Sequence, residues 1–171
     1  MLNDKVQDAF NKHLNAELYS AYLYLSMSAY FQSESLAGMA NWMRVQAQEE
    51  MVHVMKFFDF INERDGRVLL TEIGSPQTTW KSPLQAFEDA LAHERTISAR
   101  INALVDLSLA ERDHASNSFL QWFVTEQVEE EATAKAIVDK LKLTGDHPVA
   151  RYMVDEELGQ RTFQPPAPSA T

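Results

Sequence analysis

The chain has 171 residues, a formal net charge of −10 and no cysteine. This length is enough for one domain with a full hydrophobic core. The negative charge disfavours nucleic-acid binding through a basic face and favours the attraction of cations. The lack of cysteine excludes disulfides, iron–sulfur clusters, thiolate zinc sites and a thiol nucleophile.

Five glycines and six prolines are few for this length, which favours helix over sheet. The first ten residues lack a basic region followed by an apolar run, so no signal peptide is expected. No apolar stretch approaches the roughly 18 residues needed to span a bilayer. We therefore expect a soluble, cytoplasmic protein that contacts neither membrane nor nucleic acid.

The first predicted helix runs from about Asp4 to Ser33, with apolar residues recurring every three or four positions on one face. Glu17 interrupts this apolar stripe near its middle. Tyr24 lies about two turns further along the same face. A buried tyrosine usually needs only a partner for its hydroxyl, so Tyr24 has either that role or one in redox chemistry or ligand positioning.

The second predicted helix runs from about Leu36 to Arg64, after a break at Ser35 and Gly38. Glu50 sits in the middle of its apolar stripe, and His53 follows on the same face. A carboxylate on a core face is costly unless it is paired or bound to a metal. Taken alone, Glu50 is explained equally well by pairing with one arginine or lysine.

Asp65-Gly66 ends this helix, with Gly66 as the expected C-cap, and the stretch RVLLTEIGSPQTTWK that follows has no helical period. About 15 extended residues reach roughly 50 Å, and a helix of about 28 residues is roughly 42 Å long. The stretch can therefore cross the length of a bundle and leave the second and third helices parallel.

The third predicted helix starts at Ser82-Pro83 and ends near Ala110, and the fourth runs from about 115 to 143. Glu94 interrupts the third stripe, and Gln127 and Glu130 occupy successive positions of the fourth. His93, beside Glu94, is expected on the surface.

A short fifth helix is predicted from about Pro148 to Leu158. Its apolar residues are too few to fold alone, so this helix must dock on the domain or on another subunit; they are Val149, Tyr152, Met153 and Leu158. Residues 161–171 are rich in proline and predict a flexible tail after a single domain of residues 1–160.

Each of the four long helices therefore places an acid or an amide near its midpoint, facing the core. Four carboxylates and an imidazole that converge in one bundle suggest a dinuclear metal site. Mixed oxygen and nitrogen ligands suit iron or manganese, with zinc as a possible occupant. Glu50 and Glu130 are the candidates for the bridging ligand. The alternative is a buried polar network without metal.

The sequence resembles the ferritin family, and within it the bacterial non-haem ferritins, over residues 1 to about 160. The most specific segments are NAELYSAYLYLSMSAY, RVQAQEEMVHVMKFFDFI and FLQWFVTEQVEEE. This resemblance implies an all-α fold: a ferritin-like four-helix bundle with one long crossover between the second and third helices and a short fifth helix.

The resemblance also implies iron-binding residues. One iron site comprises Glu17, Glu50 and His53, and the other comprises Glu94, Glu130 and a nearby Gln127. A third iron site on the cavity side uses Glu49, Glu126 and Glu129 with Glu130. Tyr24 matches the tyrosine beside the di-iron centre, and Trp122 matches a tryptophan in the same neighbourhood.

No haem is expected. Bacterioferritins carry Glu-x-x-His twice, once on the second helix and once on the fourth. The fourth helix here carries Gln127-x-x-Glu130 instead. Met51 falls where bacterioferritins place their haem-ligand methionine, but non-haem ferritins often have a methionine there too. Helical phase puts Met51 about 100° from Glu50, off the core face.

The function implied is iron storage with ferroxidase activity. Fe(II) binds the paired sites, O2 accepts the electrons, and the ferric product is stored as mineral inside a shell of 24 identical subunits. The alternative is a di-iron or di-manganese redox enzyme, such as a peroxidase or an oxygenase, that releases its product. A purely structural bundle does not explain acids on all four core stripes.

Overall fold

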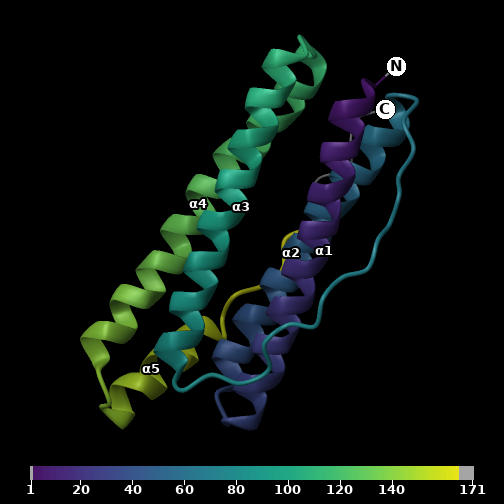
Figure 1. The fold of residues 1–171 in the computed structure, drawn as a ribbon. Helices are drawn as coiled ribbons and strands as arrows, with labels where there is room; N and C mark the ends of the chain where they lie inside the picture. The colour runs from purple at the N-terminus through teal and green to yellow at the C-terminus, as the bar shows by residue number, and fades with distance from the viewer. Residues whose placement is uncertain (1, 166–171) are drawn as a thin grey trace.

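The computed structural model describes residues 2–165, and these residues form five α-helices and no strand. The helices are α1 (Asp4–Ser33), α2 (Ala37–Glu63), α3 (Pro83–Ala110), α4 (His114–Thr144) and α5 (Pro148–Leu158). The four long helices form a bundle in which α1 pairs with α2 and α3 pairs with α4, while α5 lies at one end (Figure 1). The predicted ferritin-like bundle is confirmed, and every helix end lies within about one residue of its predicted position.

The start of three long helices is closed by a polar side chain just before the first turn. Asn3, Ser82 and Asp113 accept hydrogen bonds from the backbone N–H groups of Lys5, Gln85 and Ser116, in that order. Such caps satisfy donors that have no partner inside the helix.

The end of α2 differs from the prediction in one respect. Asp65, rather than Gly66, adopts the left-handed conformation, with φ of 55°. The N–H of Gly66 then bonds to the carbonyl of Ile61 at 2.9 Å, which closes the last turn. Glycine is required at position 66 because a Cβ there would lie 2.8 Å from that carbonyl oxygen.

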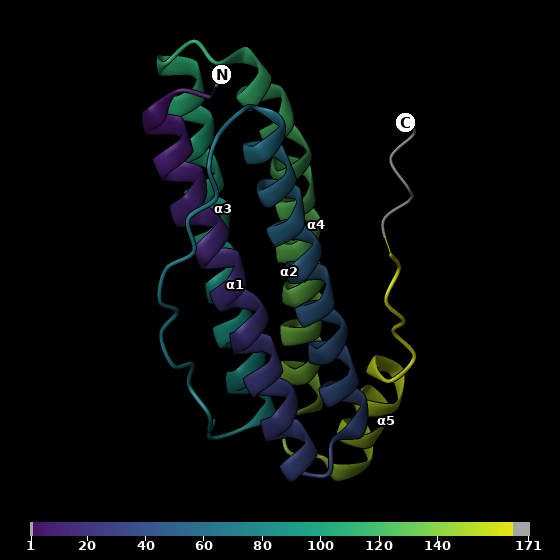
Figure 2. The same cartoon turned by 90° about the vertical axis from the view of Figure 1, so that its right-hand side faces the viewer.

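The segment between α2 and α3 runs along α1 from one end of the bundle to the other (Figure 2). Polar side chains at regular intervals on one face of α1 hold its backbone. The backbone N–H of Arg67 donates to Gln7 at 2.7 Å, Asn11 bonds Arg67 and Leu69, and Asn15 donates to the carbonyl of Glu72. These bonds satisfy backbone groups of a segment that has no secondary structure of its own. The crossover expected from the sequence is confirmed, and it makes α2 and α3 parallel.

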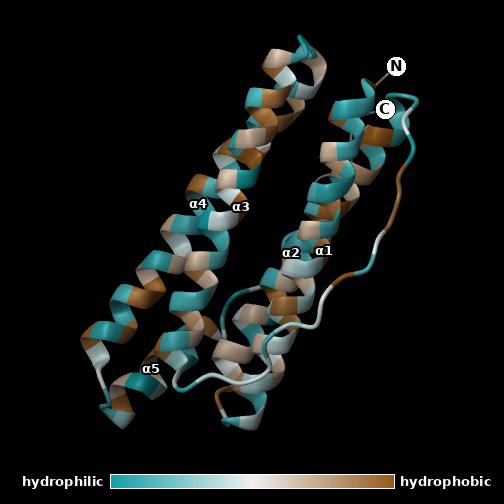
Figure 3. Cartoon of the chain, in the orientation of Figure 1, coloured by the Kyte–Doolittle hydropathy of each residue, from teal (hydrophilic) through white to brown (hydrophobic). Residues whose placement is uncertain are grey.

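The hydrophobic core is divided into two clusters along the bundle axis. One cluster contains Phe10, Leu14, Phe57 and Phe123, and the other contains Met27, Phe31, Met43 and Phe87. Each long helix contributes apolar residues to both clusters, and its predicted acids lie between these two groups of residues. The two apolar clusters therefore flank a buried polar layer. Hydrophobic and hydrophilic residues alternate along each helix, as expected for amphipathic helices (Figure 3).

Helix α5 docks through Val154, Asp155 and Leu158, which are buried. The carboxylate of Asp155 accepts hydrogen bonds from the N–H groups of Gly38 at 3.1 Å and Met39 at 2.8 Å, at the start of α2. Gly38 permits this approach, because a Cβ there would collide with the backbone of Asp155.

Of the four apolar residues predicted to dock α5, only Leu158 is buried within this chain. Val149, Tyr152 and Met153 are each more than 60% exposed. No helix among residues 2–165 is both long enough and apolar enough to cross a membrane.

Candidate metal centre

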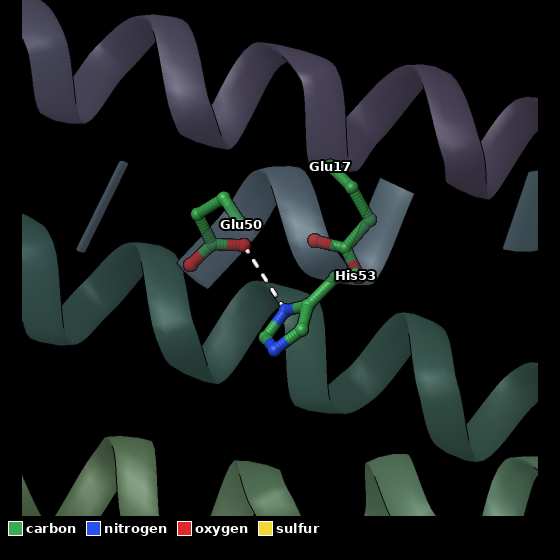
Figure 4. Close-up of side chains that lie close together, drawn as sticks. All are labelled: Glu17, Glu50 and His53. Atoms are coloured by element: carbon green, nitrogen blue, oxygen red, sulfur yellow. Dashed lines mark ion pairs between the residues drawn. The ribbon is translucent and has the colours of Figure 1, made fainter. Parts of the chain in front are cut away.

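The polar layer contains three residues from α1 and α2 whose potential ligand atoms lie close together. Single atoms of Glu17, Glu50 and His53 all lie within 4.8 Å of one another, and the three side chains are buried (Figure 4). Nδ1 of His53 is 3.3 Å from Oε2 of Glu50. This arrangement offers two carboxylates and one imidazole to a single cation.

The opposite half of the layer is supplied by α3 and α4. The amide of Gln127 donates to Oε2 of Glu94 at 3.1 Å, and the hydroxyl of Tyr24 donates to the other oxygen of that carboxylate. The two donors orient Glu94 toward the layer, and Tyr24 is 1% exposed. The position of Tyr24 beside a predicted ligand is compatible with the positioning role that the sequence suggested.

Gln46 links the two halves and was not among the residues predicted from the sequence. Its amide nitrogen donates to Oε2 of Glu130 at 2.8 Å and to Oε1 of Glu50 at 3.3 Å. Glu50 and Glu130, the two candidates for the bridging ligand, therefore share one hydrogen-bond donor. Gln46 lies one turn before Glu50, and this spacing is the signal that could have identified it.

His13 also contacts a residue of the polar layer and was not among the residues predicted from the sequence. Its Nε2 lies 2.7 Å from Oε1 of Glu17, and its ring packs 4.7 Å from that of Phe57. Both members of the pair are buried, at 2% and 0% exposure. His13 precedes Glu17 by four positions on the face that Phe10 also occupies, so helical spacing could have indicated it.

The second oxygen of Glu17, Oε2, is buried and has no hydrogen-bond partner among the described residues. A buried carboxylate oxygen without a partner is costly in a protein interior. Glu17 is also the residue that forms a potential ligand group with Glu50 and His53. A bound cation would satisfy Oε2.

Burial is the largest cause of the raised pKa in three of the four carboxyl groups. It raises the pKa of Glu50 and of Glu94 to about 8, and that of Glu130 to about 7, and nearby carboxylates add to the effect. These groups therefore keep protons near neutral pH when no metal is present. A cation that binds the layer must displace those protons.

The pKa values of Glu17 and His53 shift in the direction that favours the charged form of each group. Burial acts to raise the pKa of Glu17, but the interactions with His13, His53 and Glu50 together outweigh it and lower that pKa to about 2. Burial acts to lower the pKa of His53, but the hydrogen bond and charge of Glu50, with Glu17 and Glu130, raise it to about 10. Glu17 is thus the carboxylate already ionised in the metal-free layer.

A second group of potential ligand atoms combines His53, Glu126 and Glu130, all within 4.8 Å of one another. Two of the residues predicted for the third iron site lie outside this group. The side chain of Glu49 is ion-paired with Arg161, and Glu129 is exposed. Glu49 and Glu126 still line one pocket of about 440 Å³ together with His53.

Trp122 is 39% exposed, and its ring centroid lies 5.5 Å from that of His53, so the expected neighbourhood is found. The prediction for His93 is wrong. His93 is partly buried, and its Nε2 lies 2.7 Å from the hydroxyl of Ser20. Burial lowers the pKa of His93. Its ring packs edge-on against Tyr24 because α3 turns this side toward α1 rather than toward water.

Met51 is 42% exposed and lines an apolar groove on α2 together with Leu25 and Met55. Its side chain points away from the polar layer, as its helical phase indicated. The absence of haem stays a prediction.

Comparison with known proteins shows where this architecture belongs. The family model described as the ferritin-like domain matches residues 7–144. A bacterial non-heme ferritin of Bacteroides fragilis is 47% identical over 161 residues, which cover 94% of this chain and 100% of the relative. One from Campylobacter jejuni is 41% identical over 158 residues, which cover 92% of this chain and 95% of the relative.

Among solved structures, an engineered closed form of the Archaeoglobus fulgidus ferritin superposes with a TM-score of 0.95 at 51% identity, covering 96% of this chain and 100% of that one. The open-pore ferritin of the same archaeon gives a TM-score of 0.94 at 51% identity, covering 95% and 100%. The chain therefore belongs to the ferritin family, with bacterial non-haem ferritins among its relatives.

Proposed function

We propose that this chain is the subunit of an iron-storage protein that oxidises Fe(II) with O2 at a dinuclear site and stores the ferric product as an oxyhydroxide mineral. Family membership supports the general function. The observation that carries the finer proposal is the polar layer, in which four carboxylates and one imidazole meet between two apolar clusters. Burial of these groups is costly unless they are paired or bound to a metal.

In this proposal each half of the layer binds one Fe(II) substrate ion. Glu17, Glu50 and His53 hold the first ion, and Glu94 and Glu130, with Gln127 nearby, hold the second. Glu50 or Glu130 reaches both ions. Hard carboxylate oxygens stabilise Fe(III) more than Fe(II), so they lower the potential at which each ion gives its electron to O2.

Two further parts of the proposal concern the fate of the product. Glu126, with Glu49 and Glu129, would form a third iron site through which iron passes, sharing Glu130 with the dinuclear site. The pocket that Glu49 and Glu126 line beside His53 supports this part. Unlike the buried ligands of the layer, Glu129 reaches solvent, which suits transfer into a cavity.

The store would be a hollow shell of 24 copies of the chain, in the cytoplasm. The apolar side chains that α2 and α5 leave exposed, such as Met55, Tyr152 and Met153, support contacts between copies. This number of copies is carried over from the family.

One experiment separates iron storage from the alternative redox enzyme. Fe(II) is added in air to the purified metal-free protein, and the product is imaged by electron microscopy without stain. Storage predicts rapid oxidation and an electron-dense core inside a shell. Rapid oxidation with all ferric iron released to solution would favour a di-iron or di-manganese enzyme, and no oxidation would contradict both.

A further inference from the structure

Arg161, which the sequence placed in a flexible tail, is held against α2 beside the predicted third iron site. One guanidinium nitrogen, Nη2, donates to Oε2 of Glu49, and the other, Nη1, donates to Oε1 of Gln46 at 2.8 Å. The guanidinium also lies over the ring of Trp42, 4.4 Å from its centroid. These contacts join the segment after α5 to the polar layer.

The backbone around Arg161 is fixed independently of its guanidinium. Asn41 donates from its amide to the carbonyl oxygens of Gly159 at 3.3 Å and of Arg161 at 2.9 Å. Asp155, four residues before Gly159, caps the start of α2. In Figure 2 the chain after α5 turns back and runs beside α2. Little conformational freedom is therefore lost when the side chain reaches Glu49.

The guanidinium of Arg161 and the proposed third iron ion compete for the carboxylate of Glu49. Glu49 lines the pocket shared with His53 and Glu126, where the third iron ion would bind, yet one of its oxygens already bonds to Arg161. Arginine stays charged at all relevant pH values, so it cannot give up this oxygen by losing a proton. A metal ion gains both oxygens of Glu49 only if the guanidinium moves away.

Arg161 also decides which way Gln46 points. An amide has one acceptor end and one donor end, and its oxygen faces Arg161. Its nitrogen therefore faces Glu130 and Glu50. If the amide turned over, its oxygen would face two carboxyl groups instead. The guanidinium of Arg161 is thus linked to Glu50 and Glu130 through the side chain of Gln46.

We propose that Arg161 is a built-in competitor of the third iron ion: its guanidinium holds Glu49 and keeps that site weak, so that iron passes through it rather than staying. This inference rests on the proposed function. It assigns a role in iron traffic to a residue that contacts no predicted ligand of the dinuclear site directly.

The test is anaerobic titration of the full-length, metal-free protein with Zn(II), followed by calorimetry that resolves tight and weak sites. Arg161→Gln should strengthen the weak site about tenfold, the change expected when one charge-assisted hydrogen bond no longer competes. Arg161→Lys keeps the charge and should give a smaller change. Arg67→Gln removes the same charge from an exposed side chain and should change nothing.

Combination with Glu49→Gln assigns the effect to the ion pair. In the Glu49→Gln background, Arg161→Gln should no longer strengthen the weak site. In air, Arg161→Gln should also raise the amount of iron retained per subunit before a second addition of Fe(II) is oxidised. A weak site that is unchanged or weaker in Arg161→Gln would overturn the inference.

The outcome is distinguishable from a failure of the proposed function. If the wild-type protein shows no tight Zn(II) sites, the dinuclear site is wrong. If the tight sites are present and the affinity of the weak site for Zn(II) is the same in Arg161→Gln, only the role of Arg161 is wrong. A thermal melt of each variant shows whether the C-terminal segment still stabilises α2.

Discussion

The imidazole of His13 lies with Nε2 2.7 Å from Oε1 of Glu17, and neither side chain reaches solvent. This contact leaves Oε2 as the oxygen of Glu17 without a hydrogen-bond partner among the described residues, and Glu17 forms a potential ligand group with Glu50 and His53. In the proposed metal site, His13 would hold the Glu17 carboxylate in the orientation that a metal needs, as outer residues do around many metal sites.

The first prediction concerns this orientation. His13→Leu should slow the rapid phase of Fe(II) oxidation about tenfold, because loss of a residue that orients a ligand typically costs at least that factor. His13→Gln, whose amide can still donate to Glu17, should retain most of the rate. Stopped-flow absorbance measures both, with the exposed His147→Gln as the control. A wild-type rate in His13→Leu would refute the role.

The second prediction concerns the acids that Gln46 joins. Glu50→Ala or Glu130→Ala should abolish rapid Fe(II) oxidation, because each removes the candidate bridging carboxylate. Circular dichroism should still report a helical bundle, since burial of these acids is a cost to the fold rather than a gain. Glu72→Ala, on the exposed crossover, is the control. Rapid oxidation in either of the first two variants would contradict their assignment.

How far the sequence could predict this site depends on what periodicity records. The spacing of Glu17, Glu50, Glu94 and Glu130 within apolar stripes reveals which face each residue occupies, and all four are buried. It does not reveal how each helix is rotated against its neighbours. For that reason the contact of His93 with Ser20 and that of Gln46 with Glu130 were not predicted.

Arg161 escaped prediction for another reason. The segment that follows α5 has no helical period and carries prolines, so composition alone favours a flexible tail. Its order comes from single hydrogen bonds to Asn41, Gln46 and Glu49, which no local pattern reports. The rest of the predicted tail, residues 166–171, lies outside the described residues.

The third prediction concerns stability and pH in the metal-free protein. The ordinary pKa of these carboxyl groups is 4.5, and in the folded protein it is about 7 to 8. At pH values between these limits, the folded state binds more protons than the unfolded state at Glu50, Glu94 and Glu130. Their contribution to stability is therefore lost as pH rises through this range. His53, whose pKa is about 10, acts in the same direction from 6.5 upward.

Glu17 acts in the opposite direction, because its pKa of about 2 makes its contribution disappear only as the pH falls below 4.5. The melting temperature should therefore be highest near pH 5 and should fall toward pH 8. Thermal melts across this range measure it. Glu94→Gln, which keeps a neutral group, should flatten the fall, and an unchanged slope in that variant would count against the raised pKa.

The fourth prediction is that bound metal restores the stability that the metal-free protein loses as the pH rises. Zn(II) binds in place of the displaced protons, so it should raise the melting temperature more at pH 8 than at pH 6. At about 100 times its Kd, one bound ion adds about 2.7 kcal/mol to the free energy of unfolding. Calorimetry with and without a chelator measures the difference. No stabilisation at saturating Zn(II) would argue against a metal centre.

The fifth prediction separates the acids of the third site. Glu126 lies in a group with His53 and Glu130, whereas Glu129 is exposed. Glu126→Ala should therefore change the ratio of iron oxidised to O2 consumed more than Glu129→Ala does. Both variants should keep the rapid first phase, and both should recover more slowly before a second addition of Fe(II). An oxygen electrode follows the two additions, and wild-type behaviour in both variants would leave these acids as ordinary surface.

The central claim is that the buried polar layer binds two iron ions between α1, α2, α3 and α4. Anomalous diffraction at the iron absorption edge, from crystals soaked with Fe(II) without O2, tests it most directly. We predict two strong peaks in each subunit, one among Glu17, Glu50 and His53 and one among Glu50, Glu94 and Glu130. An empty layer in crystals that bind iron only at their surface would contradict the account.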